Sequence, residues 1–316
     1  MESRRGQQNP RDLLNLAITA QNPNSHAESS QSTMDPERRA WLQQALASTF
    51  QSVDPVQEMK ACLQILTDED CTEENQQAAF DGLLLYTENI DYANDFCKIG
   101  GLHSVKKYLT DSRPEFRSLS CEVLAQIMQN NPCCQKAVSD FGLIEAVLNT
   151  MDKDSDVSVR VKALSALSSF LRSNEVGQQA FSEMDGFSVL LRSMMDTKDS
   201  RFQTKAAFLL SRICGDNEAF RKQLGDMGVT QHLIALLRRT EHGQYHEHLM
   251  EALATLLRGN PDLVREAENQ HALVAFLRSR RREIECAEEY QEEVGYLDEI
   301  LALLKDDAVV SDHVDR

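Results

Sequence analysis

One regular spacing constrains the fold of this chain more than any other feature of its sequence. Asparagines recur at intervals of 42, 43, 43 and 43 residues, at Asn89, Asn131, Asn174, Asn217 and Asn260. Glycines form a second series with intervals of 41, 44 and 42 residues, at Gly101, Gly142, Gly186 and Gly228. Because two independent series share one period, the sequence predicts a structural unit of about 43 residues that is repeated along the chain.

Each unit is predicted to contain three helices. The asparagine caps a short first helix, since most of these asparagines precede proline or glutamate, which suit the first helical turn. The glycine lets a second helix start at a sharp angle to the first. A long third helix then ends before the next asparagine. We predict the long helices at 73–88, 114–129, 156–173, 201–214 and 245–258.

A period of about 43 residues lies within the range of about 40–47 residues that is typical of helical armadillo and HEAT repeats. Such a unit cannot bury its apolar face alone, so stacked neighbours supply the core. Glycine and proline are scarce, at 13 and 7 of 316 residues, which argues against a β-sandwich or barrel that needs frequent turns. The sequence therefore predicts an all-α fold, a right-handed α-solenoid of armadillo-like repeats with helical caps.

Composition and helix signals divide the chain further. The first residues are rich in Gln, Asn and Ser and are predicted to be disordered, apart from a short apolar motif. The dipeptides Asp35-Pro36 and Asp54-Pro55 then open helices. The predicted divisions are a disordered segment 1–34 with the motif 11–20, capping helices 35–88, four repeats 89–260, capping helices 261–306 and a disordered tail 307–316.

The charge balance excludes several classes of partner. Lysine and arginine number 33 against 50 aspartates and glutamates, a net charge of −17. Nucleic acids and anionic membranes need a basic footprint, so neither is an expected partner. No apolar stretch approaches the roughly 20 residues of a membrane span, and the start of the chain has no apolar signal region. The eight cysteines include no C-x-x-C pair and fit free thiols in a reducing compartment, which favours the cytoplasm.

The sequence offers no catalytic motif. Phosphate-binding, dinucleotide-binding and nucleophile-elbow motifs are absent, so we expect neither an enzyme nor a cofactor. A histidine-rich stretch at 241–248 lacks the order and spacing of a zinc site, and a solvated helix start is the favoured interpretation. We expect no metal. The basic run 278–282 is either the end of a helix or a nuclear signal, and the helix end is favoured.

A polar stripe along the long helices is the predicted binding surface. In helix 156–173 it lies beside the apolar seam, and steps of 43 residues extend it to the neighbouring helices, which line the concave face of such solenoids. The first long helix would add Gln77, Phe80 and Leu84. Lys162, Lys205 and Arg212 lie near the centre of the stripe and predict an acidic partner surface. The alternative is an ordinary solvated face, and Phe208 among these cations argues against it. The stripe comprises Glu122, Gln126, Lys162, Ser165, Ser169, Arg172, Lys205, Phe208, Arg212, His248, Glu251 and Thr255.

Several longer phrases resemble one known family. They are DPERRAWLQQAL, VRVKALSALSSFLRSNEVGQQAFSEMDGFSVLLRSM, KAAFLLSRICGDNEAF, RRTEHGQYHEHLMEAL and AEEYQEE, and RDLLNLAITA resembles the N-terminal segment of the same family. The family is that of the heat shock protein 70-binding proteins, armadillo-type nucleotide exchange factors of DnaK-class chaperones, in its cytosolic branch. The resemblance spans about residues 11–304.

This resemblance implies a co-chaperone whose repeats grip one lobe of the chaperone's ATPase domain, loosen the other lobe and release ADP. It also implies that the N-terminal segment occupies the chaperone's substrate-binding domain and hastens client release, through Leu13, Leu14, Leu16 and Ile18. An alternative is a passive scaffold or adaptor, for a chaperone or a ubiquitin ligase, that leaves the nucleotide unaffected.

Armadillo proteins that clamp extended peptides carry a ladder of asparagines along their third helices. The equivalent positions here hold none, so we expect a monomer that binds a folded partner. These positions are Leu84, Gln126, Ser169, Arg212 and Thr255.

Overall fold

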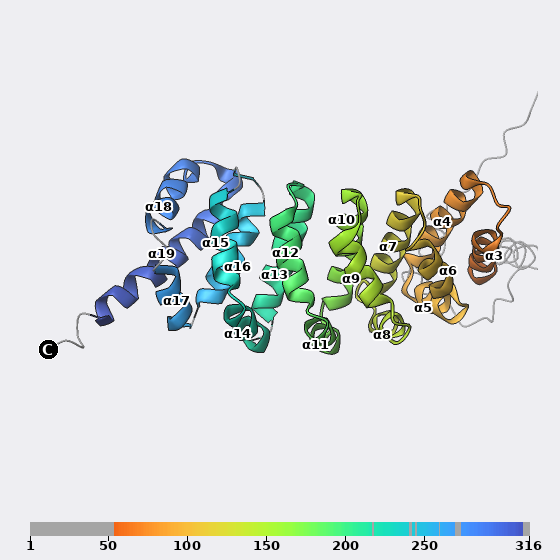
Figure 1. The fold of residues 1–316 in the computed structure, drawn as a ribbon, viewed down its shortest axis with the longest axis horizontal. Coiled ribbons are helices and arrows are strands. Elements are labelled where there is room, and N and C mark those ends of the chain that lie inside the picture. Colours follow the sequence, from red (N-terminus) through yellow and green to blue (C-terminus); the bar gives the residue numbers. More distant parts are fainter. Residues whose placement is uncertain are drawn as a thin grey trace, which may run out of the picture. The chain divides into compact units, whose positions relative to one another are not determined.

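The computed structural model describes residues 54–311, except for 217, 240, 241, 244, 259 and 269–272 (Figure 1). This part of the chain contains 17 α-helices and one short 3₁₀ helix, and no strand. The predicted all-α fold is confirmed. The N-terminal segment 1–34 with its motif 11–20, the start of the predicted cap at 35–53 and the last residues 312–316 lie outside the described residues.

The helices follow the predicted order of two shorter helices and one long helix. Two helices, α3 (Pro55–Thr67) and α4 (Glu73–Thr87), precede the first complete set. The predicted long helices agree with the observed ones to within two residues at each end. The sets are α5 (Ile90–Lys98), α6 (Gly101–Tyr108) and α7 (Pro114–Met128); α8 (Pro132–Asp140), α9 (Leu143–Lys153) and α10 (Val157–Leu171); α11 (Glu175–Glu183), α12 (Gly186–Asp196) and α13 (Ser200–Asp216); and α14 (Glu218–Asp226), α15 (Val229–Arg239) and α16 (Tyr245–Leu257).

The helices at the C-terminal end repeat the same order. They are α17 (Pro261–Glu268), α18 (Leu273–Ile284) and α19 (Gln291–Ser311), with the 3₁₀ helix η1 (Glu288–Tyr290) between the last two. The last helix continues past residue 306 to Ser311, into the segment expected to be a disordered tail. The region proposed as a C-terminal cap therefore has the helix pattern of a repeat.

Four of the five recurring asparagines cap the helix that follows them, as predicted. The Asn89 side chain accepts a hydrogen bond from the backbone N–H of Asp91 at 2.8 Å. Asn174 accepts one from Gly177 at 2.9 Å. Asn131 and Asn260 make the same type of contact, and Asn217 lies outside the described residues. These contacts satisfy N–H groups that the helix itself cannot pair.

The glycine series has two distinct structural roles, so the single role predicted for it was wrong. Left-handed backbone occurs at Gly100, Gly142, Asp185 and Gly228, with φ of 89°, 74°, 57° and 75°. Gly101 and Gly186 instead follow such a position and are buried helical residues. A Cβ atom at Gly101 would lie 2.3 Å from the Phe96 ring, and one at Gly186 would lie 2.6 Å from the Phe181 ring. At these two positions the absence of a side chain leaves room for an aromatic ring, and φ has an ordinary helical value.

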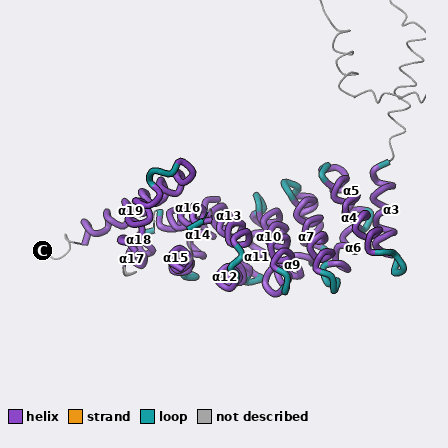
Figure 2. Tube along the Cα trace, turned by 90° about the horizontal axis from the view of Figure 1, so that it is seen from above, coloured by secondary structure: helices purple, strands orange, loops and turns teal. Residues whose placement is uncertain are grey.

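The long helices pack side by side in chain order. Each of α4, α7, α10, α13, α16 and α19 contacts the next one, and Figure 2 shows the successive helices along the array. Buried apolar side chains from Met59 to Leu304 join into one continuous core. Since each set of helices packs mainly on its neighbours, the architecture is an α-solenoid, and it places the long helices in one row.

Candidate functional site

The predicted stripe lies on four of the long helices. Residues of α7, α10 and α13 come together around one pocket of about 360 Å³, lined by Glu122, Ala125, Gln126, Gln129, Ser165, Ser168, Ser169, Arg172, Lys205 and Phe208. Seven of these ten belong to the predicted stripe. The other three are Ala125, Gln129 and Ser168, of which Ser168 lies one helical turn from Ser165 and Arg172. Stripe residues of three successive long helices therefore line one depression, and their role in partner binding stays a prediction.

The charges in the stripe are not equivalent. Lys162 forms an ion pair with Glu122 across α10 and α7, with 2.7 Å between Nζ and Oε1. Lys205 and Arg212 are exposed, and within the described part of the chain neither forms an ion pair. Of the three lysines and arginines nearest the centre of the stripe, Lys162 is thus paired, and Lys205 and Arg212 on α13 are not; Arg172, at the end of α10, is also exposed and forms no ion pair with a described residue.

Phe208 lies between these two cations on α13 and is half-buried. Its ring has the Arg212 guanidinium 5.9 Å from its centroid. The His248 ring of α16 meets it edge-on with a centroid distance of 5.1 Å. A second pocket, of about 290 Å³, lies beside the same ring and includes Arg172 and Arg212 in its lining. An aromatic ring with neighbouring cations beside two pockets is a suitable anchor for a partner protein.

Other predicted residues have structural partners within the row. The Gln126 amide donates to the backbone oxygen of Leu84 and to Thr87 Oγ1 on α4. The Ser165 hydroxyl donates to the Val161 carbonyl at 3.0 Å. Gln126 thus connects α7 to α4, whereas Ser165 bonds within its own helix.

The remaining predicted positions differ in exposure. Glu251 is half-buried and lies 3.7 Å from His248 Nδ1. Thr255 is only 6% exposed, and its helix α16 packs between α13 and α19. Phe80, expected on the first long helix, is fully buried. Phe80 belongs to the core and Thr255 is almost enclosed, so the prediction that these side chains face a partner was wrong.

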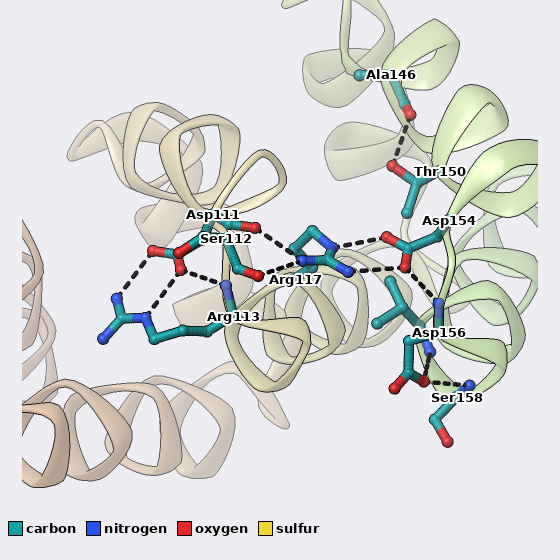
Figure 3. Close-up of polar contacts among 10 residues, drawn as sticks. Asp111, Ser112, Arg113, Arg117, Ala146, Thr150, Asp154, Asp156 and Ser158 are labelled. Atoms are coloured by element: carbon teal, nitrogen blue, oxygen red, sulfur yellow. Dashed lines mark hydrogen bonds and ion pairs between the residues drawn. The ribbon is translucent and has the colours of Figure 1, made fainter.

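One polar network fixes α7 relative to α10 (Figure 3). Arg117 makes a two-pronged contact with Asp154, at 2.6 Å from Nε and 2.8 Å from Nη2. Arg117 also donates to the backbone oxygens of Asp111 and Ser112, and Asp154 accepts from the N–H of Asp156. Planar two-pronged contacts of this kind restrict both partners. The network joins the first turns of α7 and the loop before it to the loop before α10, so it fixes the spacing of the two helices at that end.

The charge state of Asp154 follows from these contacts. Burial alone would raise the pKa of its carboxyl group. The hydrogen bonds from Arg117 and from the Asp156 backbone outweigh burial, and the pKa of Asp154 lies below its ordinary value. The carboxyl group is therefore ionised at neutral pH and pairs with Arg117.

The histidine-rich stretch is divided among different surroundings. His242 contacts Glu293 of α19 at 2.8 Å, whereas His248 packs on Phe208. His246 is fully buried, and burial lowers its pKa to about 4, so its ring is neutral at pH 7. Throughout the described residues, no group of three or more His, Cys, Asp or Glu side chains is placed to hold a metal ion. Among the described helices, none combines the length and apolar character that crossing a bilayer requires.

Comparisons with known proteins show which family the chain resembles. The family model for the SIL1/FES1/HPBP1 C-terminal domain matches residues 92–232, and that for the nucleotide exchange factor Fes1 matches residues 11–96. Hsp70-binding protein 1 of Homo sapiens is 34% identical over 308 residues, which cover 93% of this chain and 84% of that protein. This chain belongs to the SIL1/FES1/HPBP1 family. The Hsp70 nucleotide exchange factor FES1 of Coccidioides immitis is a more partial relative, 32% identical over 34% of this chain and 51% of that protein.

Solved structures support the fold independently. A designed armadillo repeat protein aligns with a TM-score of 0.63 over 79% of this chain and all of that chain, at 18% identity. Computationally designed armadillo repeat proteins for modular peptide recognition align with a TM-score of 0.64 and 19% identity, over 79% of this chain and 99% of theirs. The low identity limits this likeness to the fold, which is the armadillo type that the repeat period predicts.

Proposed function

We propose that this member of the family is a nucleotide exchange factor of heat shock protein 70 chaperones. It binds the ATPase domain of the chaperone through the stripe on α7, α10, α13 and α16 and promotes release of ADP. The family relationship supports this activity, because relatives covered over most of their length are named for binding Hsp70. The observation that carries the choice of surface is the half-buried Phe208 between the unpaired Lys205 and Arg212, beside two pockets.

The mechanism needs no reacting group in this chain. A protein that binds the open form of the ATPase domain more tightly than the ADP-bound form must lower the affinity for ADP by the same factor. The stripe contributes shape and charge, and the row of long helices contributes rigidity. We therefore propose a co-chaperone rather than an enzyme, with no cofactor of its own. We also propose that it acts in the cytoplasm as a monomer, on the strength of the resemblance to the cytosolic branch of the family.

The decisive experiment is stopped-flow release of a fluorescent ADP analogue from the isolated ATPase domain of the chaperone. A saturating amount of the full chain should accelerate release in a concentration-dependent manner. If release keeps its intrinsic rate while pull-down shows binding, the alternative function, a scaffold or adaptor for a chaperone or ubiquitin ligase, becomes the better description. Absence of both binding to the chaperone and acceleration would reject the exchange function and a scaffold for the chaperone.

We further propose that residues 11–20 contact the substrate-binding domain of the chaperone. The match of the Fes1 family model begins at residue 11, and the apolar side chains of this motif suit a groove that binds extended apolar peptides. Deletion of 11–20 should slow release of a labelled client peptide while leaving ADP release unchanged. Equal loss of both activities would contradict a separate role for this motif.

A further inference from the structure

Two cysteines from neighbouring repeats lie close together away from the stripe. Cys97 is near the end of α5, and Cys134 is in the first turns of α8. These two helices are the first helices of successive sets, and they pack on each other. The two sulfur atoms are 3.6 Å apart, and both thiols are free.

The surroundings of the two thiols differ. Cys134 is 1% exposed, and its sulfur lies 3.1 Å from Asn131 Nδ2 and 3.4 Å from Asn94 Oδ1. Cys97 is half-buried and within reach of small solutes. The hydrogen bond with Cys134 holds the pKa of Cys97 below its ordinary value, and the same hydrogen bond together with burial raises the pKa of Cys134. Because the thiolate is the nucleophile, Cys97 is the thiol that reacts first.

Most other cysteines of the described part lack this combination. Burial raises the pKa of both Cys121 and Cys214 to about 12, so these thiols stay protonated and enclosed. Cys133 and Cys286 are exposed, and among the described residues no second sulfur lies within hydrogen-bond distance of either. Cys97 and Cys134 thus form a pair with one accessible and one enclosed thiol.

We propose that Cys97 and Cys134 are a dithiol oxidation site that reacts with hydroperoxides and forms a reversible disulfide between α5 and α8. The Cys97 thiolate attacks the terminal peroxide oxygen, the O–O bond breaks, an alcohol or water leaves, and Cys97 becomes a sulfenic acid. The Cys134 sulfur then attacks the Cys97 sulfur, the S–O bond breaks and water leaves. Two thiols lose two electrons in total, and the peroxide accepts both.

The geometry needs little rearrangement. A disulfide has a sulfur–sulfur distance of about 2.05 Å, so the two sulfurs must approach by roughly 1.5 Å, which is within reach of side-chain rotation. The new bond would link residues 37 positions apart along the chain and would cross the interface between the first two sets of helices. Such a bond restricts the unfolded chain and thereby stabilises the folded array.

The test uses the full chain treated with hydrogen peroxide and then blocked with an alkylating reagent. Mass spectrometry of the undigested protein should show two fewer alkyl groups than the reduced protein blocked in the same way under denaturing conditions, and peptide mapping without reductant should identify a Cys97–Cys134 link. The oxidised protein should unfold at a temperature about 5 °C higher than the reduced protein. Dithiothreitol should reverse both changes.

Matched variants separate the neighbouring thiols. Cys133→Ser should keep the link and the shift in unfolding temperature, whereas Cys97→Ser and Cys134→Ser should lose both. A link from Cys97 to Cys133, or sulfinic acid on Cys97 without any disulfide, would overturn the proposal. Fragment-ion sequencing of the linked wild-type peptide shows whether the alkyl group is on Cys133 or on Cys134, so the result does not depend on whether Cys134→Ser folds normally.

Discussion

Lys162 on α10 and Glu122 on α7 form an ion pair 2.7 Å long across two neighbouring repeats. The pair compensates the charge of one of the cations that the sequence predicts near the centre of the stripe. The cations of the stripe without an ion pair among the described residues are therefore Arg172 at the end of α10 and Lys205 and Arg212 on α13. The two on α13 flank Phe208, and substitutions there should affect partner binding most.

The variant Lys205→Glu/Arg212→Glu should weaken acceleration of ADP release by about tenfold or more, because it replaces two attractive charges with repulsive ones at the predicted acidic partner surface. Stopped-flow titration gives the concentration for half-maximal effect, and circular dichroism verifies the helical fold. Lys162→Ala should have a much smaller effect, since that cation is already paired.

The charge-matched control is Lys136→Glu/Lys222→Glu, which changes the net charge equally on the exposed surfaces of α8 and α14. This control should retain nearly all activity. An equal loss in both double variants would mean that overall charge matters rather than the stripe, and full activity of the α13 variant would move the partner surface elsewhere.

Arg117→Met should destabilise the protein by about 2 kcal/mol, because it leaves the buried Asp154 carboxylate without its cation while keeping most of the side-chain volume. Urea unfolding followed by circular dichroism measures the loss. The double variant Arg117→Met/Asp154→Asn should recover part of it, since no unpaired charge remains. If the double variant is less stable than the sum of the single effects, the cost comes from packing rather than from the unpaired carboxylate.

Stability should fall as the solution is acidified. The pKa values of Asp111 and Asp199 are lowered by hydrogen bonds from Arg113 and Arg201, and that of Asp154 is lowered despite its burial. An unfolded aspartate titrates near pH 3.9, so below about pH 5 the unfolded state binds more protons than the folded state. The stabilisation is complete above this range and is lost as pH falls through the lower folded-state values. 

Urea midpoints at pH 7, 5, 4 and 3 test this expectation. Arg117→Met should show a shallower decline with falling pH, because the pKa of Asp154 is no longer held down. Identical pH profiles for the two proteins would contradict the assigned role of Asp154.

The two kinds of glycine should respond differently to alanine. Gly142→Ala should cost about 1 kcal/mol from its left-handed backbone alone, since a Cβ there meets no atom within 4 Å. Gly142→Asn should cost less, because asparagine tolerates this conformation. Gly186→Ala should cost more than Gly142→Ala, since its Cβ would press into the Phe181 ring. Equal costs, measured by urea unfolding, would show that the ring simply moves aside.

The repeat period predicted most of the fold because helix starts and ends are local. Capping by the asparagines depends only on the next few residues, so the sequence predicts each of these helix starts. The capping residues are Asn89, Asn131, Asn174 and Asn260. The predicted ends of the long helices agree with the observed ends to within two residues for the same reason.

The predictions that were wrong or incomplete concern side chains whose surroundings depend on contacts between helices. Whether the left-handed position is Gly101 or Gly100 depends on where the Phe96 ring lies, and spacing alone cannot show that. The pairing of Lys162 with Glu122 and the burial of Thr255 depend on how one long helix faces the next. A period of 43 residues aligns equivalent positions but leaves open which of their side chains meet.

Equivalent places on successive long helices are held by Glu122, Ser165, Phe208 and Glu251, each 43 residues from the last. The backbone thus presents equivalent positions on four successive helices with three kinds of side chain, a carboxylate, a hydroxyl and an aromatic ring. Gain or loss of one whole unit would change the length of the binding surface without shifting any remaining side chain to another face. A substitution at one of these positions would therefore change what the surface recognises at one repeat and leave the neighbouring repeats as they are.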